Sequence, residues 1–295
     1  MLELDLLSWT TILCYSCLYI AILCLWFPGK YGKFKIPAWS IVFGLACILG
    51  LMSGQIEVYA IFFIALFAYA VQYTESQYKC SKRIFAGIIV CFLAYTLGAH
   101  KIPYFCNLKV LADVYISKDA MPFTLYINFD KTVVGLLILG LTQRLLFRKK
   151  EWLAMLKQTI PKIGLLIMVL VFFALIADKV RFDPKLPESL PIWLITNLLL
   201  VCTAEEGFFR GFIQKNLVAV FKNFRQGNVM AVVVAALLFG FAHYAGGISY
   251  SIWGTFAGLG YGWIYQKTNH IEASILAHFC LNLTHFLLFT YPALA

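Results

Sequence analysis

The sequence predicts an all-α fold, a polytopic bundle of about 8–10 transmembrane helices. Its 295 residues are 62% hydrophobic and only 13% charged, which is far more apolar than a soluble domain of this size. The apolar residues form successive long runs separated by short polar connections. Ionisable side chains inside these runs are concentrated on three late helices, where charge at membrane depth is costly and usually functional.

Ten apolar runs are candidate spans. The first begins at Leu6 and lacks the basic region and small-residue cleavage site of a removable signal, so we expect it to be a retained helix. Several runs fall short of the roughly 20 residues that a span needs, which leaves the number of spans between about eight and ten. The runs are 7–27, 38–53, 58–75, 84–98, 131–147, 161–177, 190–218, 229–245, 248–266 and 271–290.

The net charge of +10 is explained by topology. Most of the 24 Lys and Arg residues lie in alternate loops or beside them, with the densest cluster between Arg144 and Lys162. The positive-inside rule makes these loops cytoplasmic and places both chain termini on the other side of the membrane. Because the basic residues are spread over short loops and form no single patch, we expect no nucleic-acid partner.

Two connections divide the chain. Residues 99–130 form the one long polar connection, for which we expect an extracytoplasmic loop with a short interfacial helix. Residues 148–160, which begin RKKEW, are expected to form an interfacial helix on the cytoplasmic face. This helix would separate amino-terminal transmembrane helices of accessory, unknown role (1–147) from a carboxy-terminal domain (161–295) that carries the unusual polar residues.

The first polar motif lies in LVCTAEEGFFRGFIQK, from Leu200 to Lys215. In a regular α-helix Glu206 and Arg210 share one face, whereas Glu205 points about 100° away. Arg210 can therefore neutralise and orient Glu206, while Glu205 faces a partner from another element and suits proton transfer. A structural ion pair beside a helix-end carboxylate at the membrane surface would explain the same spacing.

Two further helices carry the remaining polar motifs. Phe239 lies one turn before His243 at the end of an apolar run, and His278 and Asn282 share a face of the last run, which His285 continues. Each histidine alone could be a packing residue, and His and Asn also hydrogen-bond between membrane helices. Taken together, carboxylates, imidazoles and an amide supply the parts of a hydrolytic site: a base for a water and donors for an oxyanion.

Other catalytic motifs are absent from the sequence. It contains no G-x-S-x-G nucleophile elbow and no H-E-x-x-H zinc helix. GLGYG at 258–262 lacks the aspartate of an aspartyl intramembrane protease, and we interpret its glycines as positions of close helix packing. The nine cysteines show none of the clustered Cys/His spacing of a zinc site, so we interpret them as thiols that pack in the core.

The three motifs in this order resemble those of the CPBP family, which comprises the type II CAAX prenyl endopeptidases and bacteriocin-processing or immunity proteins. The resemblance covers roughly 160–292, and the amino-terminal half shows no motif of the family. The matching motifs are E-E-x-x-x-R at Glu205, Glu206 and Arg210, F-x-x-x-H at Phe239 and His243, and H-x-x-x-N at His278 and Asn282.

The resemblance implies a metal-independent, glutamate-dependent intramembrane endopeptidase whose helices surround a polar cavity. Carried over by position, Glu205 would be the general base on the attacking water, with His243 as its partner. His278 and Asn282 would polarise the scissile carbonyl group. The implied substrate is a membrane-associated protein or peptide, and the implied setting is the lipid bilayer of the bacterial cytoplasmic membrane.

The same resemblance gives Glu206, Arg210 and Phe239 a role in ordering the site. Two rival interpretations remain open at this point. One is a zinc-dependent membrane protease with Glu205, His243 and His278 as ligands, which zinc would accept. The other is a non-catalytic membrane scaffold, immunity factor or transporter whose charged residues line a cavity or a proton path.

Overall fold

The computed structural model describes residues 7–27, 29–31, 35–76 and 80–295. The chain divides into two compact units, each described here by itself. The first unit comprises Met1–Ala112, Thr124–Phe147 and Leu199–Phe208. The second comprises Asp113–Phe123, Arg148–Leu198 and Phe209–Ala295. The segment with Glu205 and Glu206 is therefore grouped with the amino-terminal helices.

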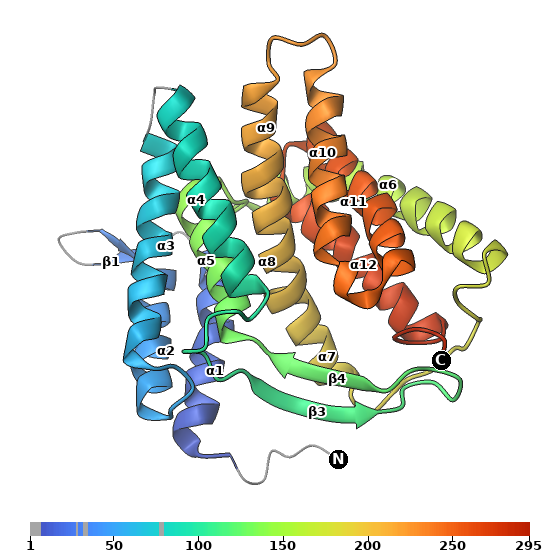
Figure 1. The fold of residues 1–295 in the computed structure, drawn as a ribbon, viewed down its shortest axis with the longest axis horizontal. Coiled ribbons are helices and arrows are strands. Elements are labelled where there is room, and N and C mark those ends of the chain that lie inside the picture. The colour runs from blue at the N-terminus through green and yellow to red at the C-terminus, as the bar shows by residue number, and fades with distance from the viewer. Residues whose placement is uncertain (1–6, 28, 32–34, 77–79) are drawn as a thin grey trace. The chain divides into compact units, whose positions relative to one another are not determined.

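Helix α5 is the core of the first unit. Its side chains from Phe129 to Leu139 are almost all buried, because α5 packs against α1, α3, α4 and α8. Helices α1 and α2 pack closely together, as do α3 and α4, which run side by side in Figure 1. The helices of this unit are α1 (Trp9–Cys24), α2 (Ala38–Met52), α3 (Val58–Ser76), α4 (Cys80–Gly98), α5 (Phe129–Thr142) and α8 (Thr203–Glu206).

The connection from α4 to α5 contains a β-hairpin, and the expected interfacial helix is wrong. Strands β3 (Leu108–Val114) and β4 (Phe123–Ile127) pair with each other. Along β4, Leu125 and Ile127 are buried while Tyr126 between them is exposed. This alternation over two residues is typical of a half-buried strand, and a search for long apolar runs does not detect it. A second small pair joins β1 (Lys30–Tyr31) to β2 (Ile36–Pro37).

The second unit is built from long helices. Helix α11 packs against α10 on one side and against α12 and α6 on others. Its helices are α6 (Lys149–Ile176), α7 (Leu190–Thr196), α9 (Lys215–Val220), α10 (Gly227–Ala242), α11 (Ile248–Thr268) and α12 (Ile271–Leu288), with a short 3₁₀ turn η4 (Tyr244–Gly246). Two π-helical segments, η2 (Asn197–Cys202) and η3 (Gly207–Gln214), continue the run from α7 through α8 to α9.

Helix α6 corrects a second expectation. The sequence predicted an interfacial helix over 148–160 and a separate span over 161–177, but the structure forms one helix of 28 residues. Pro161 lies inside it. Proline removes one backbone hydrogen bond, yet the flanking helix formers continue the helix on both sides.

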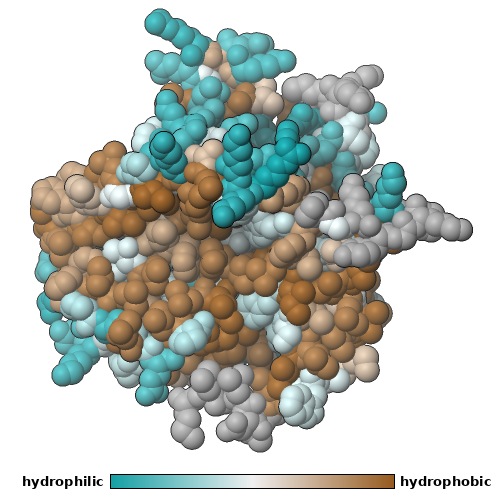
Figure 2. Space-filling model, turned by 180° about the vertical axis from the view of Figure 1, so that it is seen from behind, coloured by the Kyte–Doolittle hydropathy of each residue, from teal (hydrophilic) through white to brown (hydrophobic). Residues whose placement is uncertain are grey.

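All ten expected segments are helical, which confirms the all-α polytopic class. Among the described residues, five helices are long and apolar enough to cross a membrane. They are Val58–Ser76, Ser81–Gly98, Lys149–Ile176, Leu190–Val220 and Ile271–Leu288. Three further apolar helices, α1, α2 and α10, are shorter. Figure 2 shows broad hydrophobic areas on the face that it draws, as expected for side chains in contact with lipid.

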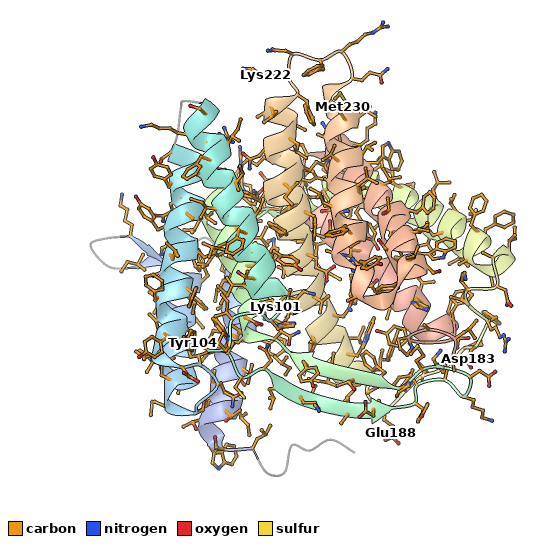
Figure 3. All side chains as sticks on the ribbon, in the orientation of Figure 1. Lys101, Tyr104, Asp183, Glu188, Lys222 and Met230 are labelled. Atoms are coloured by element: carbon orange, nitrogen blue, oxygen red, sulfur yellow. The ribbon has the colours of Figure 1, made fainter. Side chains whose placement is uncertain are left out.

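Two connections lie at opposite ends of the second unit. Lys222 lies at the turn between α9 and α10, near Met230, whereas Asp183 and Glu188 lie at the opposite end (Figure 3). The segment with the two acidic residues connects α6 to α7. The predicted orientation makes the α9–α10 turn cytoplasmic and the α6–α7 connection extracytoplasmic. That orientation stays a prediction.

Candidate active site

The helix that carries the first motif is not a regular α-helix. Four α-helical residues, Thr203–Glu206, lie between the π-helical segments η2 and η3. Glu206 and Arg210 were predicted to share a face of a regular α-helix with about 3.6 residues per turn. The regular α-helix is wrong, because the helix becomes π-helical after Glu206. A π-helix forms hydrogen bonds over five residues, which changes the direction of each side chain after Glu206. Such segments occur frequently at functional sites.

Arg210 is the motif residue of the second unit that carries a positive charge, and it has no exposed surface. Its guanidinium carbon lies 4.6 Å from the centre of the Phe239 ring and 5.3 Å from that of Tyr261. Its Nη2 donates a hydrogen bond of 2.9 Å to the carbonyl oxygen of Gly258. Aromatic faces and a carbonyl group thus compensate part of the cost of burying the charge.

Phe239 brings residues of all three motifs together. Besides Arg210, its ring contacts the imidazole of His243 at 4.5 Å and that of His278 at 5.7 Å, measured between ring centres. His278 also stacks on Tyr261, at 4.6 Å and an angle of 16°. Phe239, Tyr261 and His278 are buried. Packing therefore fixes the orientation of the His278 ring.

The hydrogen bond of His243 determines its neutral tautomer. Its Nδ1 lies 2.8 Å from the carbonyl oxygen of Phe239. A carbonyl oxygen can only accept, so Nδ1 carries the proton and donates it. In the neutral ring Nε2 is then the nitrogen that carries the lone pair and acts as a hydrogen-bond acceptor.

Asn282 has a partner that the sequence did not indicate. Its Nδ2 donates a hydrogen bond of 3.2 Å to Oδ1 of Asn197, at the start of η2. Asn197 was visible in the sequence as an asparagine inside an apolar run, but nothing there showed that it contacts the last helix. His285, which continues the predicted stripe, has Nε2 3.0 Å from the carbonyl oxygen of Thr290 and thus helps to close the end of α12.

The glycines of GLGYG are packing positions, as the sequence predicted. A Cβ atom on Gly258 would lie 3.2 Å from Nη2 of Arg210, and one on Gly262 would lie 2.7 Å from Oε1 of Gln214. Gln214 makes the same kind of contact with α11 as Arg210 does, four residues further along. Its Nε2 donates a hydrogen bond of 3.0 Å to the carbonyl oxygen of Gly262. Gln214 was not among the predicted site residues, although it follows Arg210 by four positions.

In the first unit, Glu205 forms an ion pair with Lys131 of α5. Lys131 Nζ lies 2.6 Å from Oε1 of Glu205, and their side chains are 21% and 12% exposed. This confirms that Glu205 faces a partner from another element. Lys131 itself was missed, because it was counted only as a loop charge at the start of a predicted span. Glu206 is completely buried.

Close helix packing holds α8 against α5. A Cβ atom on Gly135 would lie only 2.5 Å from Cα of Ala204. A Cβ atom on Gly207 would lie 3.3 Å from the Leu139 side chain. Small residues let two helices approach until their backbones touch. The position of Glu205 relative to α5 is therefore fixed by backbone contact as well as by the ion pair.

The structure brings no set of metal ligands together within the described residues. No group of three or more His, Cys, Asp and Glu side chains is arranged there so that it could hold a metal ion.

The fold and the buried polar motifs define a multi-pass membrane protein with a polar site on its late helices. Residues 187–284 match the family model described as Type II CAAX prenyl endopeptidase Rce1-like. Over this region, about a third of the chain, the protein is similar to that family of membrane endopeptidases. No curated protein matches the chain. No solved structure matches it.

The family match includes every motif residue from Glu205 to Asn282. It supports the family resemblance of the motifs, and membrane proteases of this family imply a membrane-associated substrate. The roles of the individual residues stay predictions.

Proposed function

We propose that the protein is a glutamate-dependent intramembrane endopeptidase that hydrolyses a peptide bond of a membrane-associated protein or peptide. In this proposal Glu205 is the general base on a water and His243 is its partner. His278 and Asn282 polarise the scissile carbonyl. No metal ion and no other cofactor takes part.

The contacts of Phe239 carry this proposal. One buried ring touches Arg210, His243 and His278, which come from three separate helices and from all three motifs. Residues that merely pack apolar helices together would not need a buried cation and two imidazoles around one ring, because charged and polar groups are costly there. The cluster instead fits side chains that are held in fixed directions for chemistry.

The proposed reaction needs two proton movements. The water oxygen attacks the carbonyl carbon while Glu205 accepts its proton, and the neutral His243 holds the water through Nε2. The carbonyl oxygen becomes an oxyanion, to which His278 and Asn282 donate hydrogen bonds. Glu205 then returns the proton to the amide nitrogen as the carbon–nitrogen bond breaks, so that a carboxylic acid and an amine leave and Glu205 is again a carboxylate.

Glu206, Arg210 and Phe239 order the site in this proposal. Arg210 is fixed by Gly258 and by two aromatic faces, so its charge cannot move freely to serve as a proton carrier. A guanidinium group also stays protonated under all physiological conditions. Its contribution is a fixed positive charge in a buried site.

We further propose the bacterial cytoplasmic membrane as the location. The experiment below decides whether the substrate carries a prenyl group. A CAAX substrate has a prenylated cysteine, whereas other members of the CPBP family process different peptides.

A comparison of peptide termini in cells tests the function. Cells with the wild-type protein are compared with cells that carry Glu205→Ala, and cells with Glu188→Ala, an exposed glutamate, serve as the matched control. A new amino or carboxy terminus that depends on Glu205 and not on Glu188 would identify the substrate. Identical termini in all three strains would favour the scaffold or transporter interpretation.

Metal analysis of the purified protein separates the remaining rival. Stoichiometric zinc that is lost in Glu205→Ala, His243→Ala and His278→Ala would support a metalloenzyme and contradict the proposal.

A further inference from the structure

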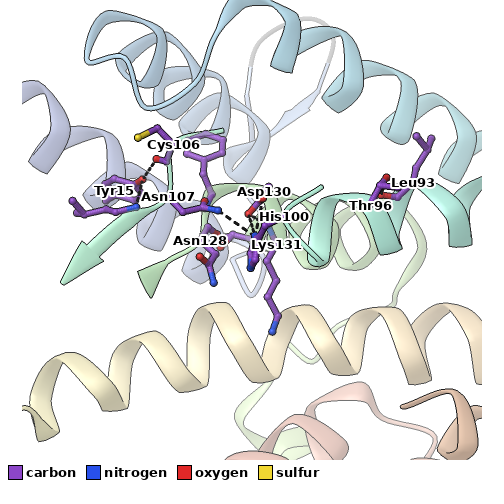
Figure 4. A network of polar contacts seen from close by, with 12 residues as sticks. Tyr15, Leu93, Thr96, His100, Cys106, Asn107, Asn128, Asp130 and Lys131 are labelled. Carbon is purple, nitrogen blue, oxygen red and sulfur yellow. Dashed lines mark hydrogen bonds and ion pairs between the residues drawn. The ribbon is translucent and has the colours of Figure 1, made fainter. Parts of the chain in front are cut away.

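The start of α5 is held by side chains of the α4–α5 connection. The first backbone N–H groups of a helix have no partner within it. Here the Phe129 N–H donates to Oδ1 of Asn107 at 2.8 Å, and the Lys131 N–H donates to Oδ1 of Asp130, also at 2.8 Å. These bonds fix the backbone from which the Lys131 side chain extends (Figure 4).

Asp130 is itself held from outside its helix. It has no exposed surface, and its Oδ2 lies 2.9 Å from Nδ1 of His100. The connection is anchored further back by Tyr15 of α1, which donates to the carbonyl oxygen of Cys106 at 3.1 Å and accepts from the Leu108 N–H at 3.1 Å. Figure 4 shows these contacts in one view. A continuous set of polar contacts therefore leads from α1 to the residue before Lys131.

The side chain of Lys131 leaves this cluster and reaches Glu205. Asp130 is engaged by His100, so the ammonium group pairs with the carboxylate on α8 at 2.6 Å. Gly135 lies four residues after Lys131 on the same face of α5 and touches the backbone of Ala204. Ion pair and backbone contact thus join the same two helices one turn apart.

We propose that Lys131 is a positioning residue that keeps Glu205 ionised and pointed in one direction, an inference that rests on the proposed role of Glu205 as the base. A carboxyl group that is 12% exposed in an apolar surrounding tends to become neutral, because burial disfavours the charged form. A neutral carboxyl group cannot accept a proton from water. An ammonium group at hydrogen-bond distance favours the ionised form and removes that obstacle.

This gives the amino-terminal helices a part in the chemistry. The first unit contributes Lys131 together with the contacts that fix it, none of which lies in the region matched by the family model. A change in α1 or in the α4–α5 connection would therefore act on the base through the start of α5.

Chemical labelling of Glu205 tests the inference without a substrate. Dicyclohexylcarbodiimide is an apolar reagent that adds to carboxylic acids and not to carboxylates. The full-length protein is purified in detergent and treated at neutral pH, and mass spectrometry with fragmentation measures the labelled fraction of Glu205 separately from Glu206. Variants are Lys131→Met, Lys131→Gln and Lys131→Arg, with Lys101→Met as the control for an exposed lysine of the same unit.

We expect slow labelling of Glu205 in the wild type and in Lys131→Arg and Lys101→Met. In Lys131→Met and Lys131→Gln it should rise by about tenfold or more, because the charge-assisted hydrogen bond that favours the carboxylate form of Glu205 is lost. Glutamine keeps a hydrogen-bond donor at this position, so Lys131→Gln provides the test if Lys131→Met does not fold. A labelled fraction of Glu205 as low as in the wild type, in both Lys131→Met and Lys131→Gln, would overturn the inference. Full turnover in Glu205→Gln would instead overturn the proposed function, whatever the labelling shows.

Discussion

The contact between α5 and α8 leads to a prediction that is independent of the reaction. In Gly135→Ala the new methyl carbon would lie 2.5 Å from Cα of Ala204, whereas ordinary contacts between carbon atoms begin near about 3.5 Å. The atom that it meets belongs to the backbone and cannot rotate away. The two helices must therefore separate by about 1 Å, and overpacking of this kind costs about 1–3 kcal/mol.

Gly87→Ala provides the matched control. Gly87 lies inside α4 of the same unit, and a Cβ atom there would meet no atom within 4 Å. In an open helical position Ala is about 0.5–1 kcal/mol more favourable than Gly. Both glycines lie inside helices, so this gain is common to both variants, and they should differ by the overpacking cost of about 1–3 kcal/mol in the free energy of unfolding.

Thermal unfolding in detergent measures the difference. We expect Gly87→Ala to unfold at or slightly above the wild-type temperature and Gly135→Ala several degrees below it. The labelling of Glu205 should also rise in Gly135→Ala, since a wider gap between the helices weakens the pair with Lys131. Equal unfolding temperatures for both variants would refute the close contact of α5 and α8.

Three further tests concern the motifs and the cysteines near them. Arg210→Lys should lower turnover and stability together, because an ammonium group cannot stack on Phe239 as the planar guanidinium does. Turnover and stability equal to those of the wild type would contradict the cation–π site. Asn282→Ala should lower turnover by about 10² to 10³ with little change in KM, measured on the identified substrate; an unchanged turnover would exclude it as an oxyanion donor. Activity should survive chelators and the double variant Cys202→Ala, Cys280→Ala, whereas loss on chelation and recovery with zinc would favour the metalloenzyme.

Hydrophobic runs were enough to predict the helices. Every expected span is helical because long apolar runs must satisfy their own backbone hydrogen bonds. The same method missed the β3–β4 hairpin, in which alternation extends over only a few residues such as Leu125 to Ile127. It also separated 148–160 from the following span, because the basic residues that begin this segment indicated an interfacial helix, whereas the structure continues α6 through both.

The site was predictable in its residues and less so in its geometry. The three motifs identified Arg210, Phe239, His243 and His278, which the structure groups around one ring. The π-helical segments carried no signal, because backbone hydrogen bonding over five residues leaves no clear pattern in one sequence. Lys131 was missed because its partner lies on a distant segment and a lysine beside a span normally indicates topology.

The exchange of Glu205 for Gln tests the central claim most directly. Glutamine keeps the size of the side chain but cannot accept the proton of the water. The account predicts that Glu205→Gln accumulates and folds normally while turnover falls by about 10² to 10⁴, as is typical when a general base is removed. Glu206→Gln should reduce folding or accumulation instead, because the proposal gives this completely buried carboxylate a role in ordering the site. Full turnover in Glu205→Gln, beside a well-folded but inactive Glu206→Gln, would contradict the assignment of Glu205 as the base.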